Sequence, residues 1–255
     1  MDKAVDIYQF EKGEPVVRVQ GLSFELDGRP ILKDVNFEAR SGEITAILGG
    51  SGSGKTTVLK HLLGLYVPGE GEVEVLGRNP YRIDEYEESD FYRNLGVLFQ
   101  EGALLNSLTV NENVGLPLEQ HTDLPEEFIR KLVGLKLQLV ELENTGDLYP
   151  PMLSGGMLKR AALARAIAMD PQILFCDEPG AGLDPVTLSQ LDKLILKLKE
   201  MLGMTVVIVT HEVSSIHRIA DRIVFLENGE SVFEGSVQQA LVSDIPALKD
   251  FFNAS

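Results

Sequence analysis

One stretch of eight residues constrains the fold of this chain more than any other. It reads G-x-x-x-x-G-K-[S/T] and follows directly after the apolar run 44–48. Its residues are Gly49, Gly50, Ser51, Gly52, Ser53, Gly54, Lys55 and Thr56. The pattern predicts a phosphate-binding loop between a buried strand and a helix that begins near Lys55. Glycines let successive backbone N–H groups converge on one anion, and the start of the helix adds the positive end of its dipole.

Two side chains of this loop have expected roles on a polyphosphate. Lys55 should reach the β- and γ-phosphates, and the Thr56 hydroxyl should occupy one position on a Mg²⁺ ion that bridges the same oxygens. The alternative is a glycine-rich turn with a surface lysine. It does not account for the apolar helical spacing of residues 58–63.

A second glycine pair stands before another expected helix. Residues 153–157, which read LSGGM, precede a segment rich in Ala and Leu that we expect to be helical over 158–169 and to end at Asp170-Pro171. Lys159 and Arg160 fall in the first turn of that expected helix, where the dipole disfavours cations unless an anion offsets them. A triphosphate would be such an anion. The alternative is an ordinary helix cap with solvated charges.

Two apolar runs end in polar residues, as parallel strands do at the edge of a sheet that binds a ligand. Residues 173–178 end in Asp177 and Glu178. Their alternating directions on a strand would let Asp177 hold Mg²⁺ and let Glu178 polarise the attacking water as general base. Two surface acids that cap the next helix are the alternative. The run 206–210 leads into His211, which we expect to sense the γ-phosphate.

These segments resemble the ABC-type ATPase family over nearly the whole chain. Six of the family's motifs occur in order: Walker A at 49–57, the Q-loop at Gln100, the signature at 153–157, Walker B at 173–178, the D-loop at 181–184 and the H-loop at His211. The resemblance implies two ATP molecules with Mg²⁺, enclosed between two head-to-tail copies of the chain. It also assigns ATP contact to Thr57 and Asp184, a metal-binding and catalytic role to Gln100, and contact with the partner copy's ATP to Ser154, Gly155 and Gly156.

The chain departs from the family pattern at two places. Met157 stands where the signature has Gln, so side-chain hydrogen bonding is lost there while the backbone donors and Ser154 remain. The family also stacks an aromatic ring on adenine. Phe24 is the aromatic candidate, although the spacing puts the expected position nearer Leu26. Phe24 is therefore either the adenine platform or a core residue.

The expected fold class is α/β, with a P-loop NTPase (RecA-like) core, an N-terminal antiparallel β segment and an inserted helical subdomain. We interpret residues 1–255 as a single nucleotide-binding domain, with the helical subdomain at 101–160 and the catalytic core at 1–100 and 161–255. The parallel core should use strands 44–48, 95–99, 173–177 and 206–210, and the other expected strands are 16–19, 72–76 and a hairpin of 223–226 and 231–234 joined by Asn228-Gly229. The expected helices include 110–119, 126–142 and one or two short ones in 238–252.

Charge and cysteine content exclude several classes of protein. The net charge of −16 opposes broad contact with nucleic acid, and we expect no nucleic-acid partner. The single cysteine, Cys176, excludes an internal disulfide framework and should act as a small core side chain. The chain has no run of 18 apolar residues, and residues 1–6 carry acids rather than a leader, so we expect a cytoplasmic protein.

A finer resemblance concerns what is transported. Residues 102–105, residues 119–125 and the signature with Met157 look like those of the ATPase subunits of Mce/Mla-type lipid transporters. Those assemblies shuttle phospholipid between the inner and outer membranes of bacteria. The resemblance implies a peripheral location on the inner face of the inner membrane. It also implies three partners: an integral-membrane permease, an MCE-type periplasmic lipid-binding subunit and a small cytoplasmic regulatory subunit.

Two other classes share part of this pattern. An ATPase subunit for a polar solute would have every catalytic motif and would differ only in the insertion. A soluble ABC-type ATPase of translation, DNA repair or Fe–S assembly would serve no permease, but a single nucleotide-binding unit, strong acidity and the lack of zinc-ligand cysteines weigh against repair and translation members. In a transport subunit, Leu104 and Leu105 are either apolar anchors for the permease or core residues of the insertion.

Overall fold

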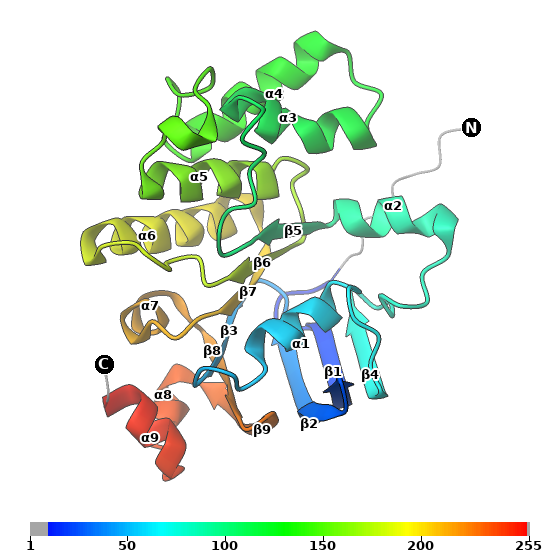
Figure 1. Ribbon diagram of the computed structural model, residues 1–255, viewed down its shortest axis with the longest axis vertical. Helices are drawn as coiled ribbons and strands as arrows, with labels where there is room; N and C mark the ends of the chain where they lie inside the picture. The colour runs from blue at the N-terminus through cyan, green and yellow to red at the C-terminus, as the bar shows by residue number, and fades with distance from the viewer. Residues whose placement is uncertain (1–9, 254–255) are drawn as a thin grey trace. The chain divides into compact units, whose positions relative to one another are not determined.

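The computed structural model describes residues 10–253, so the expectation for residues 1–6 lies outside the described part of the chain. The chain forms two compact units (Figure 1). The first consists of Met1–Asp90 and Thr205–Ser255, and the second of Phe91–Met204. Helix α2 (Glu85–Arg93) crosses the first boundary between them in the sequence.

The first unit contains an antiparallel sheet of strands β2-β1-β4. Strand β1 spans Pro15–Leu26, β2 spans Arg29–Arg40 and β4 spans Glu70–Val75. The sheet confirms the N-terminal antiparallel β segment, but the sequence pattern misses β2. Asp34 has a φ of 50°, and this irregularity interrupts the alternation of buried and exposed side chains near the middle of β2. The alternation is regular over residues 35–39 and could have revealed that half of the strand.

The first unit also contains the strands that lead to the phosphate loop. Strand β3 (Ile44–Gly49) is fully buried and lies between two parallel neighbours, β7 (Thr205–Val209) and β8 (Arg222–Glu227). Strand β9 (Glu230–Ser236) pairs antiparallel with β8. The expected hairpin is confirmed, and its turn residues Asn228 and Gly229 have φ values of 51° and 84°, as a type I′ turn requires. The pattern does not indicate that β8 is also a parallel strand of the core.

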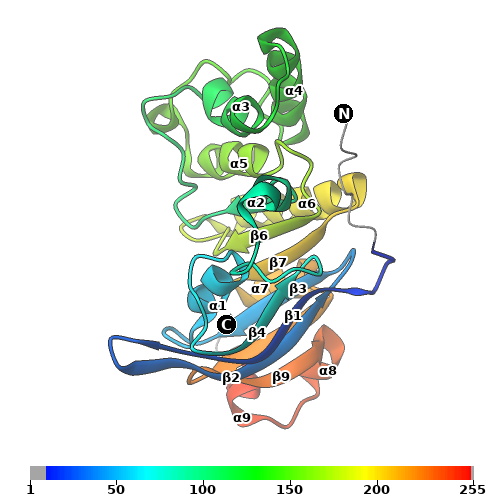
Figure 2. The same cartoon turned by 90° about the vertical axis from the view of Figure 1, so that its right-hand side faces the viewer.

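Helices pack on both groups of strands in the first unit. Helix α1 (Lys55–Leu62) contacts β2 and β4 of the antiparallel sheet as well as β3 and β7 (Figure 1, Figure 2). Three further helices follow later in the chain: α7 at Val213–Ile219, α8 at Val237–Leu241 and α9 at Pro246–Asn253. Phe251 and Phe252 of α9 pack against the core of this unit, and the Phe251 ring lies 5.4 Å from that of Phe225. The C-terminal segment therefore packs on its own unit.

The second unit contains two parallel strands, β5 (Leu95–Leu98) and β6 (Ile173–Asp177). The segment between them in the sequence holds α3 (Val110–His121), α4 (Glu126–Leu139), a 3-10 turn at Pro150–Met152 and α5 (Gly155–Ala166). Helix α6 (Pro185–Leu202) follows β6. The boundaries 101–160 of an inserted subdomain stay a prediction.

Three helices differ from the expectation. Helix α5 begins at Gly155 rather than near Leu158, because the Ser154 hydroxyl caps the helix and both glycines of the signature are already helical. Helix α4 ends at Leu139 rather than Leu142, since Glu141 has a left-handed φ of 60°. The sequence pattern does not reveal α2, which is mostly acidic and buries only Phe91.

Candidate functional site

The phosphate loop of the first unit is bounded by two glycines that cannot be replaced without strain. Gly49, the last residue of β3, has a φ of 148°, and a Cβ atom there would collide with the carbonyl oxygen of Leu226. Gly54 has a φ of 100°, and a Cβ atom there would lie 2.5 Å from Leu32 Cδ2. The backbone between the two glycines therefore follows a path that residues with side chains rarely adopt.

The Lys55 side chain folds back over this loop. Its Nζ atom donates hydrogen bonds of 2.9 Å to the carbonyl oxygens of both Gly49 and Gly50. A further hydrogen bond of 3.2 Å from the Ser53 N–H to the Gly50 carbonyl closes the turn. The ammonium is thus held over the loop by backbone acceptors.

The start of α1 is suited to an anion. Its N-cap residue, Gly54, provides no side-chain cap, and its first turn contains no acidic residue. The Ser53 hydroxyl is buried and has no hydrogen-bond partner among residues 10–253. Amide groups at a helix start, an uncompensated dipole and a lysine ammonium together fit the polyphosphate predicted from the sequence.

His211 lies at the same edge of the parallel strands as the loop. Strands β3 and β7 are neighbours with Ile47 opposite Val209, and the Thr210 N–H continues the pairing by donating to the Ile47 carbonyl at 3.2 Å. His211 follows with a side chain that is 59% exposed, and its Nε2 lies 3.9 Å from Glu212 Oε1. Its position fits the γ-phosphate role, which stays a prediction.

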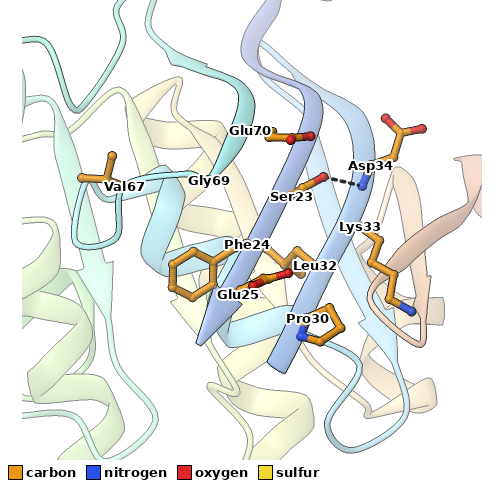
Figure 3. Close-up of a pocket in the computed structure, with 10 residues that line it drawn as sticks. All are labelled: Ser23, Phe24, Glu25, Pro30, Leu32, Lys33, Asp34, Val67, Gly69 and Glu70. Carbon is orange, nitrogen blue, oxygen red and sulfur yellow. Dashed lines mark hydrogen bonds between the residues drawn. The ribbon is translucent and has the colours of Figure 1, made fainter. Parts of the chain in front are cut away.

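A cavity of about 570 Å³ is lined by residues of β1 and β2 and of the segment that leads into β4 (Figure 3). Leu32, which packs against Gly54 of the loop, lines this cavity together with Phe24 and Lys33. The Phe24 ring stacks on Tyr66, with centroids 5.2 Å apart, and meets the His61 ring edge-on at 4.7 Å. Phe24 is therefore part of an aromatic cluster that the sequence pattern does not indicate. Stacking of adenine on its ring stays a prediction.

The second unit brings the other predicted catalytic residues to one edge of its two strands. Leu98 of β5 lies opposite Cys176 of β6, so Gln100 and the pair Asp177 and Glu178 follow the carboxyl ends of neighbouring parallel strands. Asp177 is buried, with 8% exposure, and ends β6. Cys176 is fully buried, as expected of a core side chain, and burial raises the pKa of its thiol.

Glu178 is not on the strand, which corrects the argument from alternation. It follows the last residue of β6 with a left-handed φ of 46°. The direction of its side chain is therefore set by this turn rather than by the pleat of the strand. A glutamate in such a conformation is strained, and strain of this kind concentrates at functional sites.

The anions that offset the basic residues of the signature helix come from the protein, contrary to the expectation. The Lys159 side chain is buried, and its ammonium donates to the carbonyl oxygen of Gln100. Burial lowers the pKa of Lys159, while Glu101, Glu178 and Asp177 oppose that shift by stabilising the charged form. Arg160 donates to Glu141 Oε2 at 2.9 Å.

The signature residues form the capped start of α5. The Ser154 Oγ atom accepts a hydrogen bond of 3.3 Å from the Met157 N–H. A Cβ atom at Gly156 would lie 2.6 Å from Thr187 Cγ2, whereas at Gly155 the nearest neighbour, Leu183 Cδ2, would be 3.7 Å away. A side chain at Gly156 would thus force Thr187 to shift, and Gly155 is exposed and free of that constraint.

Asp184 caps the start of helix α6, a structural role that the sequence motif does not predict. Its Oδ1 atom accepts from the N–H groups of Val186 and Thr187 at the start of α6, and its Oδ2 atom accepts from the Thr187 hydroxyl. These bonds, the Thr187 hydroxyl first, lower the pKa of the Asp184 carboxyl. The Asp184-Pro185 dipeptide is itself a helix-start signal that could have revealed the cap. A contact of Asp184 with ATP stays a prediction.

The loop between β3 and α1 defines the class of protein. A buried strand, a glycine loop with a lysine over it and an uncompensated helix start are the phosphate-binding unit of P-loop nucleoside triphosphatases. No helix among residues 10–253 has both the length and the apolar character needed to cross a bilayer.

Comparison with known proteins identifies the family. Residues 32–181 match a family model described as ABC transporter. The chain is 40% identical over 228 residues to the "Intermembrane phospholipid transport system ATP-binding protein MlaF" of Haemophilus influenzae. The matched region covers 89% of this chain and 86% of that protein. It is 38% identical over 237 residues to the "Probable ribonucleotide transport ATP-binding protein mkl" of Mycobacterium leprae. That match covers 93% of this chain and 68% of the mycobacterial protein.

A solved structure agrees with the sequence comparisons. The dimeric post-hydrolysis state of the ATP-binding cassette MJ0796, bound to ADP and Pi, matches with a TM-score of 0.78 and 34% identity over 87% of this chain and 98% of that one. This chain belongs to the ABC transporter family. It is an ABC-type ATPase with the P-loop NTPase fold that the sequence predicts.

The cap at Asp184 gives a prediction about stability. Asp184→Ala should lower the melting temperature by about 2–4 °C, whereas Asp184→Asn should lower it less, because Asn is also a good N-cap. Because the folded pKa lies below the unfolded value, the stabilisation by the charged cap is present at neutral pH and is lost as the pH falls through the folded pKa. Thermal melts of both variants at neutral and acidic pH measure this. Equal melting temperatures for Ala, Asn and wild type would contradict it.

Proposed function

We propose that this chain is the ATP-hydrolysing subunit of a transporter that moves phospholipid between the inner and outer membranes of a bacterium. The observation that carries the proposal is the 40% identity to the Haemophilus influenzae phospholipid-transport protein over 89% of this chain. The resemblance of residues 102–105, 119–125 and Met157 to lipid-transport ATPases supports it independently of the phosphate loop.

In this proposal each predicted site residue has a role on bound ATP. The phosphate loop and Thr57 bind the phosphates, with Lys55 on the β- and γ-phosphates. Mg²⁺ would be held by Thr56, Gln100 and Asp177, and it would neutralise charge that develops on the phosphate oxygens. Glu178 accepts a proton from the attacking water, and His211 contacts the γ-phosphate.

The working form in this proposal is a homodimer. The structure of MJ0796 with ADP and Pi is dimeric, which supports the same arrangement here. The family resemblance puts Ser154, Gly155 and Gly156 of one copy on the ATP of the other. The exposure of Ser154 and Gly155 at the start of α5 is consistent with a contact made outside the chain itself.

The proposed membrane partner docks on the segment after the Q-loop. Leu105 is 46% exposed, which favours an anchor for a permease over a core residue. Its backbone is fixed by Asn113, which is fully buried, accepts from the Leu105 N–H at 2.8 Å and donates to its carbonyl at 3.0 Å. A permease bound here would hold the chain on the inner face of the inner membrane, and an MCE-type periplasmic subunit and a small regulatory subunit would complete the assembly.

A second candidate function is transport of a polar solute. The Mycobacterium leprae relative named for ribonucleotide transport is 38% identical over 93% of this chain. Purification of the chain from its native membranes in mild detergent separates the two candidates. Our proposal predicts a multi-span permease with an MCE-type subunit and bound phospholipid, whereas a permease that carries no lipid and binds a soluble nucleotide would favour the second candidate.

The first prediction for the proposed site separates binding from hydrolysis. Glu178→Gln should leave ATP binding intact and lower turnover by roughly 10²- to 10⁴-fold, because the amide keeps the shape and loses the base. Lys55→Ala should weaken ATP binding as well as turnover, since it removes the charge on the phosphates. Nucleotide binding and steady-state turnover of the purified assembly measure both effects.

The control is Glu200→Gln, which neutralises an exposed carboxylate on α6 of the same unit and should leave turnover unchanged. Near-normal turnover of the Glu178→Gln assembly would remove Glu178 from the role of base. Equal, wild-type ATP affinity in both site variants would contradict the assignment of Lys55.

The second prediction tests the shared site. A Lys55→Ala chain mixed with a Gly155→Asp chain forms hybrid dimers with one intact site, so the mixture should recover up to about a quarter of wild-type turnover while each variant alone has little. Gly155 is chosen because its nearest neighbour leaves room for a side chain, and Gly155→Ala serves as the uncharged control. A mixture no more active than its components would contradict contact across the dimer.

The third prediction tests docking. Leu105→Asp should keep its melting temperature and its ATP binding, because the side chain is exposed, yet it should fail to co-purify with the permease. Leu135→Asp, at a position 55% exposed on α4, is the matched control and should still co-purify. A Leu105→Asp chain that misfolds favours a core role, and a folded one that retains its permease refutes the docking segment.

A further inference from the structure

One face of the signature helix α5 binds the backbone of the Q-loop within the second unit. Lys159, Ala162 and Arg165 lie on successive turns of the helix, and each of them contacts or approaches residues 100–103. The Lys159 ammonium donates to the carbonyl oxygen of Gln100. The Arg165 guanidinium donates to the carbonyl oxygens of Gly102, at 2.9 Å, and Ala103, at 2.7 Å. Three carbonyls within four residues of the Q-loop thus accept from two cations of one helix.

The loop approaches the helix closely between these two contacts. A Cβ atom at Gly102 would lie only 3.2 Å from the Cβ atom of Ala162, so the small residues allow the backbone to touch the helix. Gly102 and Ala103 have φ values of 76° and 52°, and their left-handed conformations aim consecutive carbonyls at the helix. Alanine rarely adopts this conformation, and it persists only where the surroundings fix it.

The two cations differ in burial. Lys159 is 5% exposed and Arg165 is half-buried. A buried ammonium is stable only with polar and anionic partners, and here these are the Gln100 carbonyl and the carboxylates of Glu101, Asp177 and Glu178. The lysine therefore touches the Q-loop while its charge acts on the predicted catalytic acids.

We propose that Lys159, Ala162 and Arg165 form a clamp that fixes the Q-loop backbone to the signature helix, so that Gln100 and the signature glycines move as one body. Lys159 and Arg165 are positioning residues, since the clamp acts through backbone carbonyls. The signature glycines lie one helical turn before Lys159 on α5, and the proposed permease segment follows the Q-loop directly. A displacement of residues 100–103 is thereby transmitted to the start of α5. This consequence for catalysis rests on the proposed function.

Hydrogen exchange on the full-length chain tests the clamp without nucleotide. Lys159→Met keeps the length of the side chain and removes the donor, so the amides of residues 100–105 should exchange roughly tenfold faster than in wild type. Lys159→Arg retains a cation with several donors and should restore slow exchange. Lys197→Met, at an exposed lysine on α6, is the control and should change nothing.

A second variant keeps the test informative if Lys159→Met fails to fold. Arg165→Met removes both contacts to Gly102 and Ala103, and it should produce the same local acceleration, which Arg165→Lys should partly reverse. Acceleration confined to residues 100–105 and the start of α5 supports the clamp. Exchange equal to wild type, acceleration spread evenly over α3 to α6, or failure of both conservative variants to slow exchange would overturn it.

Turnover then separates the clamp from the proposed function. In the purified assembly, Lys159→Met should lower kcat by roughly tenfold with KM for ATP nearly unchanged, because the phosphate loop is intact. Lys159→Arg should recover most of that loss. Faster exchange with an unchanged kcat would overturn the positioning role and leave the assignment of the ATP site standing. A wild-type assembly that does not transport phospholipid would contradict the proposed function and leave the exchange result standing.

Discussion

The contact between Gly49 and the Leu226 carbonyl determines where β3 ends and where the phosphate loop begins. Strands β3 and β8 are parallel neighbours with these two residues opposite each other, and no Cβ atom fits between them. The backbone leaves the sheet at this point, the Lys55 ammonium folds onto the first two loop carbonyls, and α1 starts without a cap or an acid. The close backbone approach ends the strand, and the composition of the first turn of α1 leaves its start open to an anion.

In the second unit, two adjacent carboxylates lie at the buried end of strand β6 and require a compensating charge. Asp177 is buried, Glu178 follows it in a left-handed conformation, and a buried lysine from α5 provides the compensating charge. The same lysine fixes the Q-loop carbonyl. The charge of Lys159 therefore acts on the predicted catalytic acids while the same side chain, together with Arg165, binds the Q-loop to the signature helix.

The sequence motifs predicted the site residues better than the strands, helix caps and side-chain contacts that hold them in place. The glycine loop, the strand edges at Gln100, Asp177 and His211, and the Asn228-Gly229 hairpin all depend on local chemistry that a sequence displays. Strand β2 could have been predicted only in part, from the alternation at residues 35–39, because Asp34 interrupts the pattern before it. The partners of Lys159 were not predictable because a contact to a backbone carbonyl 59 residues away leaves no pattern. The cap at Asp184 could have been predicted from Asp184-Pro185, since a helix-start signal needs no tertiary information.

Reconstitution tests most directly whether ATP hydrolysis by this chain drives phospholipid transfer. The assembly purified from native membranes would be placed in donor vesicles, and transfer of labelled phospholipid to acceptor vesicles carrying the periplasmic lipid-binding partner would be followed. We expect the rate of phospholipid transfer to change on addition of ATP, and we expect no such change with the Glu178→Gln assembly. The same rate of phospholipid transfer with and without ATP, together with ATP-driven movement of a ribonucleotide, would contradict a role in phospholipid transport.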